Sequence, residues 1–142
     1  MPIPQKKINN LKISIILPNY NSSKYIDATI KSIINQSFKN WELIIIDDCS
    51  DEKTKKILSK YLKNKKIKII WLKKNRGTGY CRNLAIKKSK SKYLAFIDSD
   101  DLWEKNKLKI QLEYMIKNNY SFTYTNYKTI DDNNKIIGNI VA

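Results

Sequence analysis

Residues 13–20 read Ile13-Ser14-Ile15-Ile16-Leu17-Pro18-Asn19-Tyr20, and this short stretch decides the fold. The run Ile13–Leu17 is apolar and rich in β-branched side chains, which is typical of a buried strand. Pro18 is expected to stop that strand, and a polar loop follows. A second run of this kind, Trp41–Ile46, leads directly into the polar residues Asp47-Asp48-Cys49-Ser50. Both segments predict buried strands that present polar side chains at their carboxyl ends.

Amphipathic segments alternate with strands along the rest of the chain. After Ser22 or Ser23, either of which can cap a helix, isoleucines recur at helical spacing: Ile26, Ile30, Ile33 and Ile34. Ser50 is a partial capping signal for a second helix, whose apolar stripe is Ile57, Leu58, Tyr61 and Leu62. Further strands are predicted at Ile67–Leu72, Tyr93–Ile97 and Ser121–Tyr127, with helices around Tyr80–Lys88 and along Leu108, Leu112, Met115 and Ile116. Turn residues at 131–134 predict a hairpin between Tyr127 and Ile136.

This alternation, with a period of about 25–30 residues, predicts right-handed crossovers that build a mostly parallel sheet with helices on both faces. We therefore expect an α/β fold in one domain over residues 12–142, with residues 1–11 as an N-terminal extension. Ligands of such sheets bind at the carboxyl ends of the strands. That rule selects four loops as candidates for a site, at residues 18–23, 47–50, 75–79 and 98–101.

The composition removes several classes of function. The chain has 142 residues, with 28 Lys and Arg against 13 Asp and Glu, two Cys and no His. Without His there is no Ser-His-Asp triad and no His-ligated metal, so acid–base or metal chemistry must fall to carboxylates. The formal charge of +15 suits a membrane surface or another polyanion. Because the lysine runs lack interleaved aromatic residues, they favour solvated helix faces and argue against nucleic acid as a partner.

The apolar runs are far shorter than the roughly 18 residues of a spanning helix, and the start of the chain lacks a secretory core. We expect a cytoplasmic protein, and peripheral contact with the inner face of the membrane stays open.

The first candidate loop, residues 18–23, contains no glycine. A dinucleotide fingerprint and a P-loop both need glycine there, because other side chains keep a helix amino end away from the phosphates. A bound nucleotide diphosphate must therefore be neutralised in another way. Asp98-Ser99-Asp100 offers one, since carboxylates two residues apart at a strand end can hold a hard divalent cation. These acids, with Asp101, equally suit a cap for a helix beginning near Leu102.

Asp47 and Asp48 lie at the end of another strand and before another predicted helix. They too can either contact a ligand or cap that helix. A carboxylate there can accept the imino N–H of a uracil or thymine ring, and Tyr20 can stack on that ring. Tyr20 is also one of nine tyrosines, so core packing stays open for it. Both arginines of the chain, Arg76 and Arg82, fall in one window after the third strand. This placement indicates a need for a planar, bidentate donor to phosphate or carboxylate.

Taken in order, these loops resemble those of the family 2 glycosyltransferases of the GT-A fold. The matching stretches are Ser14–Asn21, Ser32–Phe38, Trp41–Asp51, Asn75–Ala85 and Tyr93–Trp103. Members of this family transfer a sugar from a nucleotide-sugar donor to an acceptor hydroxyl, usually with inversion. The resemblance therefore implies a Rossmann-like GT-A sheet, here truncated on the acceptor side.

The resemblance also implies a donor site. It gives donor-binding roles to Pro18, Tyr20, Asp47, Asp48, Arg82 and Asp98. Asp48, with Asp47 beside it, matches the acid that reads the base. Asp98 and Asp100 match an Asp-x-Asp motif, in which Asp100 ligates Mn²⁺ or Mg²⁺ and Asp98 is directed to the ribose and to metal-bound water.

The implied function is metal-dependent transfer, with a UDP-sugar favoured, to a glycan or lipid-linked acceptor in cell-surface polysaccharide synthesis. The family's general base, an Asp or Glu, has no match among the acids beyond Trp103, which are Glu104, Glu113, Asp131 and Asp132. We therefore expect the chain to bind donor and to transfer sugar poorly. Two alternatives remain, a nucleotide-sugar-binding module without turnover and a basic polyanion-binding domain with steep salt dependence.

Overall fold

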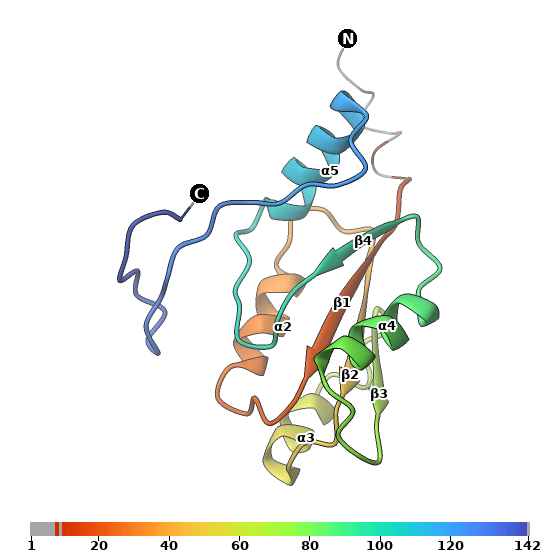
Figure 1. Cartoon of the computed structure of the whole chain (residues 1–142), viewed down its shortest axis with the longest axis vertical. Helices are drawn as coiled ribbons and strands as arrows, with labels where there is room; N and C mark the ends of the chain where they lie inside the picture. Colours follow the sequence, from red (N-terminus) through yellow and green to blue (C-terminus); the bar gives the residue numbers. More distant parts are fainter. Residues whose placement is uncertain (1–7, 9, 142) are drawn as a thin grey trace.

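The computed structural model describes residue 8 and residues 10–141, and its centre is one parallel sheet (Figure 1). The strands are β1 (Ile13–Asn19), β2 (Trp41–Asp47), β3 (Ile67–Trp71) and β4 (Tyr93–Phe96), in the order β3-β2-β1-β4. All three pairings are parallel. The α/β class is confirmed, as are these four of the five predicted strands.

Helices cover both faces of the sheet, as predicted (Figure 1). They are α2 (Ile26–Ile34), α3 (Glu52–Ser59), α4 (Thr78–Lys88) and α5 (Lys107–Asn118). Successive side chains of a strand point to opposite faces. Ile15 and Leu17 of β1 belong to the core shared with α2, α3 and α5, whereas Ile16 packs with Cys81 and Ala85 of α4. All seven residues of β1 are buried, as a central strand with two covered faces requires.

Pro18 does not stop β1, so that prediction is wrong. The proline pairs with Ile46 of β2, and the strand continues to Asn19. Ile16 directs its carbonyl oxygen toward the β4 side, where it accepts the N–H of Ile97 at 3.2 Å. Pro18, two residues on, has the same orientation. Its missing N–H therefore ends the ladder with β4 and leaves the ladder with β2 intact.

Both predicted serine caps are wrong. The N-cap of α2 is Tyr25, with no side-chain cap bond, because the carbonyl oxygen of Ser22 closes a turn just before it. The N-cap of α3 is Asp51, whose carboxylate accepts the N–H of Thr54 at 2.8 Å. The hydroxyl of Ser50 is engaged elsewhere, by the N–H of Asn21 at 3.0 Å. In each case the serine serves the loop, and the helix begins at a later residue.

The predicted fifth strand, Ser121–Tyr127, is absent from the described chain, and that prediction is wrong. The segment alternates as a strand should, yet Phe122 and Tyr124 are each 78% exposed. Its pairing in residues 10–141 is a single antiparallel bridge from Tyr127 to Val141. Alternation produces a strand only where a neighbouring strand supplies packing and hydrogen bonds.

The predicted hairpin after this segment is confirmed. Ile130 pairs with Ile136 in an antiparallel bridge, and the N–H of Asp131 donates to the carbonyl oxygen of Lys135 at 2.9 Å. The carboxylate of Asp131 accepts the N–H groups of Asn133 and Lys135, both at 2.9 Å. The turn at residues 131–134 is thus held by its own acid, as an Asx turn is.

A buried glutamine joins α2 to α5 and yields a prediction of stability. The Gln36 amide donates to the carbonyl oxygen of Glu104 at 2.9 Å and accepts the N–H of Leu108 at 3.1 Å. We expect Gln36→Met to lower the free energy of unfolding by about 1–3 kcal/mol, because both backbone groups lose their partner. Urea denaturation measures the loss. The exposed change Lys63→Met is the control and should stay within about 0.5 kcal/mol; equal stability of both variants would contradict the bridging role of Gln36.

Candidate functional site

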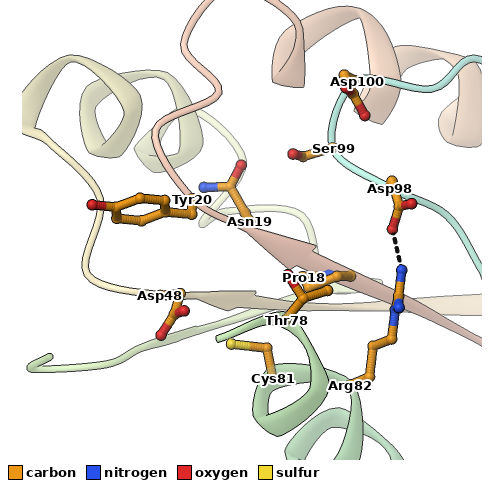
Figure 2. Close-up of a pocket in the computed structure, with 10 residues that line it drawn as sticks. All are labelled: Pro18, Asn19, Tyr20, Asp48, Thr78, Cys81, Arg82, Asp98, Ser99 and Asp100. Carbon is orange, nitrogen blue, oxygen red and sulfur yellow. Dashed lines mark hydrogen bonds and ion pairs between the residues drawn. The ribbon is translucent and has the colours of Figure 1, made fainter. Parts of the chain in front are cut away.

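A cavity of about 500 Å³ opens at the carboxyl ends of β1, β2 and β4, beside the first turn of α4 (Figure 2). Its lining residues are Pro18, Asn19, Tyr20, Asp48, Thr78, Cys81, Arg82, Asp98, Ser99 and Asp100. The loops selected from the sequence therefore meet at one place. Of the predicted site residues, Pro18, Tyr20, Asp48, Arg82, Asp98 and Asp100 line the cavity, and Asp47 does not.

Asp48 connects two of the loops. The residue is 3% exposed. One carboxylate oxygen accepts the N–H of Arg76 at 2.7 Å, and the other accepts the N–H of Gly77 at 2.8 Å. Gly77, with a φ of 86°, lies in a region where glycine is favoured, immediately before α4. Asp48 thus fixes the loop that leads into the helix carrying Cys81 and Arg82.

Asp47 is buried completely, on the other side of the strand from Asp48. Its carboxylate accepts the amide N–H of Asn19 at 2.7 Å and the backbone N–H of Ser50 at 3.1 Å. The structure therefore places Asp47 behind the cavity wall, contrary to the expectation of a donor-contacting group.

Tyr20 follows the last residue of β1 and is 52% exposed at the cavity. The pairing of Asn19 with Asp47 brings Tyr20 and Asp48 to the same edge of the sheet. Figure 2 shows the Tyr20 ring and the Asp48 carboxylate on the same side of the cavity. The exposed ring face is free of core packing, which supports the stacking interpretation over the packing one.

Arg82 and Asp98 form an ion pair across the opposite side of the cavity, with Nη2 and Oδ1 at 2.5 Å (Figure 2). Their side chains are 40% and 51% exposed. An ion pair this open to water contributes little to stability, typically about 0–1 kcal/mol. Both groups can therefore exchange this contact for a bound anion or cation at small cost.

The loop after β4 presents its acids at the cavity. The carbonyl oxygen of Ser99 accepts the hydroxyl of Thr29 on α2 at 3.0 Å, which holds Asp98 and Asp100 on either side. Desolvation raises the pKa of the neighbouring Asp101, and the charges of Asp100 and Asp98 raise it further. The carboxylates of Asp98, Asp100 and Asp101 therefore repel one another.

Residue 8 and residues 10–141 contain no cluster of three or more His, Cys, Asp or Glu side chains that could hold a metal ion by themselves. Asp98 and Asp100 do supply carboxylate oxygens, the ligands that Mg²⁺ and Mn²⁺ prefer. A cation that uses few protein ligands and fills its remaining positions with phosphate oxygens and water fits this donor set.

The acids beyond Trp103 lie outside the cavity lining. Asp132 pairs with Lys24 at 2.6 Å and accepts the hydroxyl of Tyr25 at 2.9 Å. The hydrogen bond from Lys24 and then that from Tyr25 lower the pKa of Asp132, which makes it a weaker base. Asp131 is used by the hairpin turn. Among the described residues, Asp131, Asp132, Glu104 and Glu113 thus all lie outside the lining of this cavity.

Four lining residues had no role predicted from the sequence: Asn19, Thr78, Cys81 and Ser99. Asn19 lies in the first candidate loop, at the end of a strand, and this position could have indicated that it lines the site. Thr78 opens α4 immediately after Gly77. A hydroxyl at the first position of a helix beside a candidate loop is the pattern that would have indicated it.

The cavity thiol of Cys81 gives a chemical prediction. Burial, then the charge of Asp48, raises the pKa of Cys81 to about 11, and the residue is fully buried. At pH 8 about one thiol in a thousand is then the reactive thiolate. We expect iodoacetamide to label the half-exposed Cys49 well before Cys81 in the folded chain. Peptide mass spectrometry measures both rates, with the urea-unfolded chain as control; equal rates in the folded chain would refute the shielding.

No helix within residue 8 and residues 10–141 has the length and apolar character needed to cross a membrane.

Comparisons with known proteins agree with this architecture. The chain matches the family model described as Glycosyl transferase family 2 over residues 14–140. It is 42% identical to WfgD of Escherichia coli, named UDP-Glc:alpha-D-GlcNAc-diphosphoundecaprenol beta-1,3-glucosyltransferase, over 131 residues. That alignment covers 92% of this chain and 51% of WfgD, so the chain spans about half the length of this relative.

Solved structures give the same result. Staphylococcus aureus TarS 1-349 in complex with UDP superposes with a TM-score of 0.70 at 35% identity, covering 75% of this chain and 32% of that one. The TarS complex with UDP-GlcNAc gives the same four values. A mannosyltransferase of Pyrobaculum calidifontis, in complex with GDP-Man and Mn²⁺, shares the fold at a TM-score of 0.68 and 17% identity, over 75% of this chain and 33% of its own. With the family model matched over residues 14–140, the chain belongs to glycosyltransferase family 2.

Proposed function

We propose that this chain forms the donor-binding part of a glycosyltransferase that moves a sugar from a UDP-sugar to a hydroxyl of a glycan or lipid-linked acceptor. The observation that carries the proposal is the convergence of Tyr20, Asp48, Arg82, Asp98 and Asp100 on one cavity. The TarS complexes with UDP and UDP-GlcNAc support the choice of donor, and the name of WfgD supports a lipid-linked acceptor. The proposed setting is cell-surface polysaccharide synthesis, in the cytoplasm and in peripheral contact with the membrane that carries the acceptor.

The base is assigned to the side of the cavity that holds Tyr20 and Asp48. Each oxygen of Asp48 accepts one loop N–H, and a carboxylate has about four acceptor positions, so about two remain and one of them is assigned to the imino N–H of uracil. Tyr20 supplies the stacking face, and Pro18 forms the floor beside it. Asp47 acts through Asp48 and does not touch the donor.

The diphosphate is assigned to the side that holds Arg82 and the acids after β4. Arg82 offers a planar, charged donor to phosphate oxygens, and Asp98 is then free for the ribose hydroxyls. Asp100, with Asp98, would hold Mn²⁺ or Mg²⁺. Such a cation would supply positive charge to the departing diphosphate. The acceptor hydroxyl is proposed to attack opposite the leaving group, with inversion at the sugar carbon.

A second candidate is a module that binds the nucleotide-sugar without turnover. The observation that favours it is the placement of the acids beyond Trp103 outside the cavity. Both candidates share the donor site, so a binding test comes first and a transfer assay separates them.

The test of the donor site is base selectivity. We expect the chain to bind UDP about 10- to 100-fold more tightly than CDP, because the acceptor N3 of cytosine would leave a buried polar group of Asp48 facing another acceptor. Isothermal calorimetry at fixed Mn²⁺ measures both affinities. Asp48→Asn presents a donor as well as an acceptor and should bring the two affinities together. Equal binding of UDP and CDP by the unaltered chain would count against the assignment of Asp48.

A further inference from the structure

A cluster of buried polar side chains extends from the cavity lining, at Asn19, to the protein interior behind the base side of the cavity, and the assigned donor contacts do not use it. Its members Asn19, Asp47 and Ser50 are 2%, 0% and 4% exposed. Burying polar groups costs free energy unless each finds a hydrogen-bond partner. We call Asn19, Asp47 and Ser50 the buried triad.

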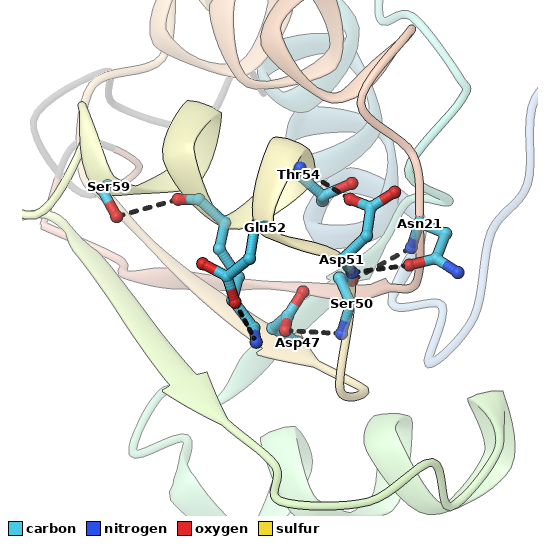
Figure 3. Close-up of polar contacts among 8 residues, drawn as sticks. Asn21, Asp47, Ser50, Asp51, Glu52, Thr54 and Ser59 are labelled. Atoms are coloured by element: carbon cyan, nitrogen blue, oxygen red, sulfur yellow. Dashed lines mark hydrogen bonds and ion pairs between the residues drawn. The ribbon is translucent and has the colours of Figure 1, made fainter.

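The triad joins the ends of the two central strands. The Asn19 amide nitrogen donates to Oδ1 of Asp47 at 2.7 Å and to Oγ of Ser50 at 3.2 Å. The second oxygen of Asp47 accepts the N–H of Ser50 at 3.1 Å, as Figure 3 shows. The backbone carbonyl oxygen of Asn19 accepts the N–H of Asp48 at 2.8 Å. The carboxylate, the amide and the hydroxyl are all partnered by these bonds.

The bonds continue into the loops beyond the strands. Oγ of Ser50 accepts the N–H of Asn21 at 3.0 Å, and the side-chain oxygen of Asn21 accepts the N–H of Asp51 at 2.8 Å (Figure 3). Asn21 and Cys49 have φ angles of 48° and 65°, which residues other than glycine seldom adopt. Such conformations persist only when the surrounding structure holds them. The hydrogen bonds of the triad and its extension hold the backbone of Asn21 and Cys49 in these conformations.

Asn19 and Asp47 of the triad, and the strained residues Asn21 and Cys49, are each next in sequence to a residue that faces the cavity. Tyr20 stands between Asn19 and Asn21, and Asp48 stands between Asp47 and Cys49. The hydrogen bonds of the triad and its extension therefore hold the backbone on both sides of Tyr20 and Asp48. A stacking ring and a hydrogen-bond acceptor select one base over another only when their relative position is fixed.

We propose that Asn19, Asp47 and Ser50 are positioning residues that set the spacing of Tyr20 and Asp48 for a uracil base. The inference rests on the proposed function, because it assigns the base to that side of the cavity. It differs from a role in stability alone, which would lower the melting temperature of a variant and leave its base preference unchanged.

The experiment compares Ser50→Ala with Ser50→Thr in the chain of residues 1–142. Calorimetry with UDP and with CDP gives the ratio of the two dissociation constants. Ser50→Ala should reduce the preference for UDP by about fivefold to tenfold, as the loss of one hydrogen bond to the loop implies. Ser50→Thr keeps the oxygen and should retain the preference.

Ser14→Ala is the matched control. Ser14 is fully buried on the same strand pair, at the end remote from the cavity, and its hydroxyl donates to Glu42 at 2.6 Å. This variant should lose thermal stability and keep the UDP preference. A Ser50→Ala variant that behaves like Ser14→Ala would overturn the positioning role while UDP binding by the unaltered chain upholds the proposed function.

Asn21→Gly keeps the test decisive if Ser50→Ala fails to fold. Asn21 is exposed, and glycine adopts its φ of 48° without strain, so this variant removes one link of the network and preserves the fold. Its UDP preference should fall as well, and an unchanged preference would overturn the inference. An unaltered chain that binds neither UDP nor CDP would overturn the inference and the proposed function together.

Discussion

Replacing Asp100 with asparagine is expected to remove most of the gain in UDP affinity that Mn²⁺ gives the unaltered chain. The cavity lining offers Asp48, Asp98 and Asp100 as its carboxylates, and Asp48 already serves the loop before α4. Asp98 shares its charge with Arg82. Asp100 is therefore the acid on which a hard cation depends most, since a neutral amide is a much weaker ligand than a carboxylate.

Calorimetry with UDP, in the presence and absence of Mn²⁺, measures this effect. We expect Mn²⁺ to raise the UDP affinity of the unaltered chain by about tenfold or more, and that of Asp100→Asn by less than about threefold. Asp101→Asn is the matched control, because Asp101 is adjacent in sequence and lies outside the cavity lining. An Asp100→Asn variant with the full Mn²⁺ gain would remove Asp100 from the proposed metal site.

The second large effect concerns turnover. We expect residues 1–142 to bind UDP-sugar and to transfer the sugar at a rate at least about 10²–10⁴-fold below that of a complete family member, the usual contribution of a general base. The reason is structural: Asp132 is bound to Lys24 and Tyr25, Asp131 holds a turn, and Glu104 and Glu113 lie away from the cavity.

A transfer assay with UDP-glucose, UDP-GlcNAc and a panel of glycan and lipid-linked acceptors tests this expectation. Binding of the same donors, measured in parallel, is the control that separates an inactive chain from an unfolded one. Transfer by residues 1–142 at rates typical of the family would refute the prediction. Variants of Glu104, Glu113, Asp131 and Asp132 would then locate the base.

The four parallel strands could be predicted because their signals are local. Ile13–Leu17 and Trp41–Ile46 are apolar runs with β-branched residues, and such runs are buried wherever they occur in a parallel sheet. The segment at 121–127 could not be resolved in this way, because its alternation is a strand signal that needs a partner to become a strand. Phe122 and Tyr124 alternate along the chain as strand residues do, yet both rings remain exposed to solvent.

The loops that form the site could be predicted, since the carboxyl ends of parallel strands meet at one edge of the sheet. The roles of adjacent residues were harder to separate. Asp47 and Asp48 look equivalent in sequence, yet strand alternation sends one inward and the other to the cavity. The triad was not predictable, because it depends on which side chains of β1 and β2 end at the same level, and that register is a property of the assembled sheet.

The central place of β1 has a consequence for how the protein is made. In the order β3-β2-β1-β4, the strand of the sheet that is made first of the four is an inner one. β1 pairs with β2 on one side and with β4 on the other. β4 is synthesised only after all three crossover connections between the strands. Parallel pairing across long loops is slow, because chain entropy is lost before any contact is gained. The apolar run Ile13–Leu17 therefore lacks its β4 partner until Tyr93–Phe96 has been made, and an apolar strand without its partner is prone to aggregate during that time.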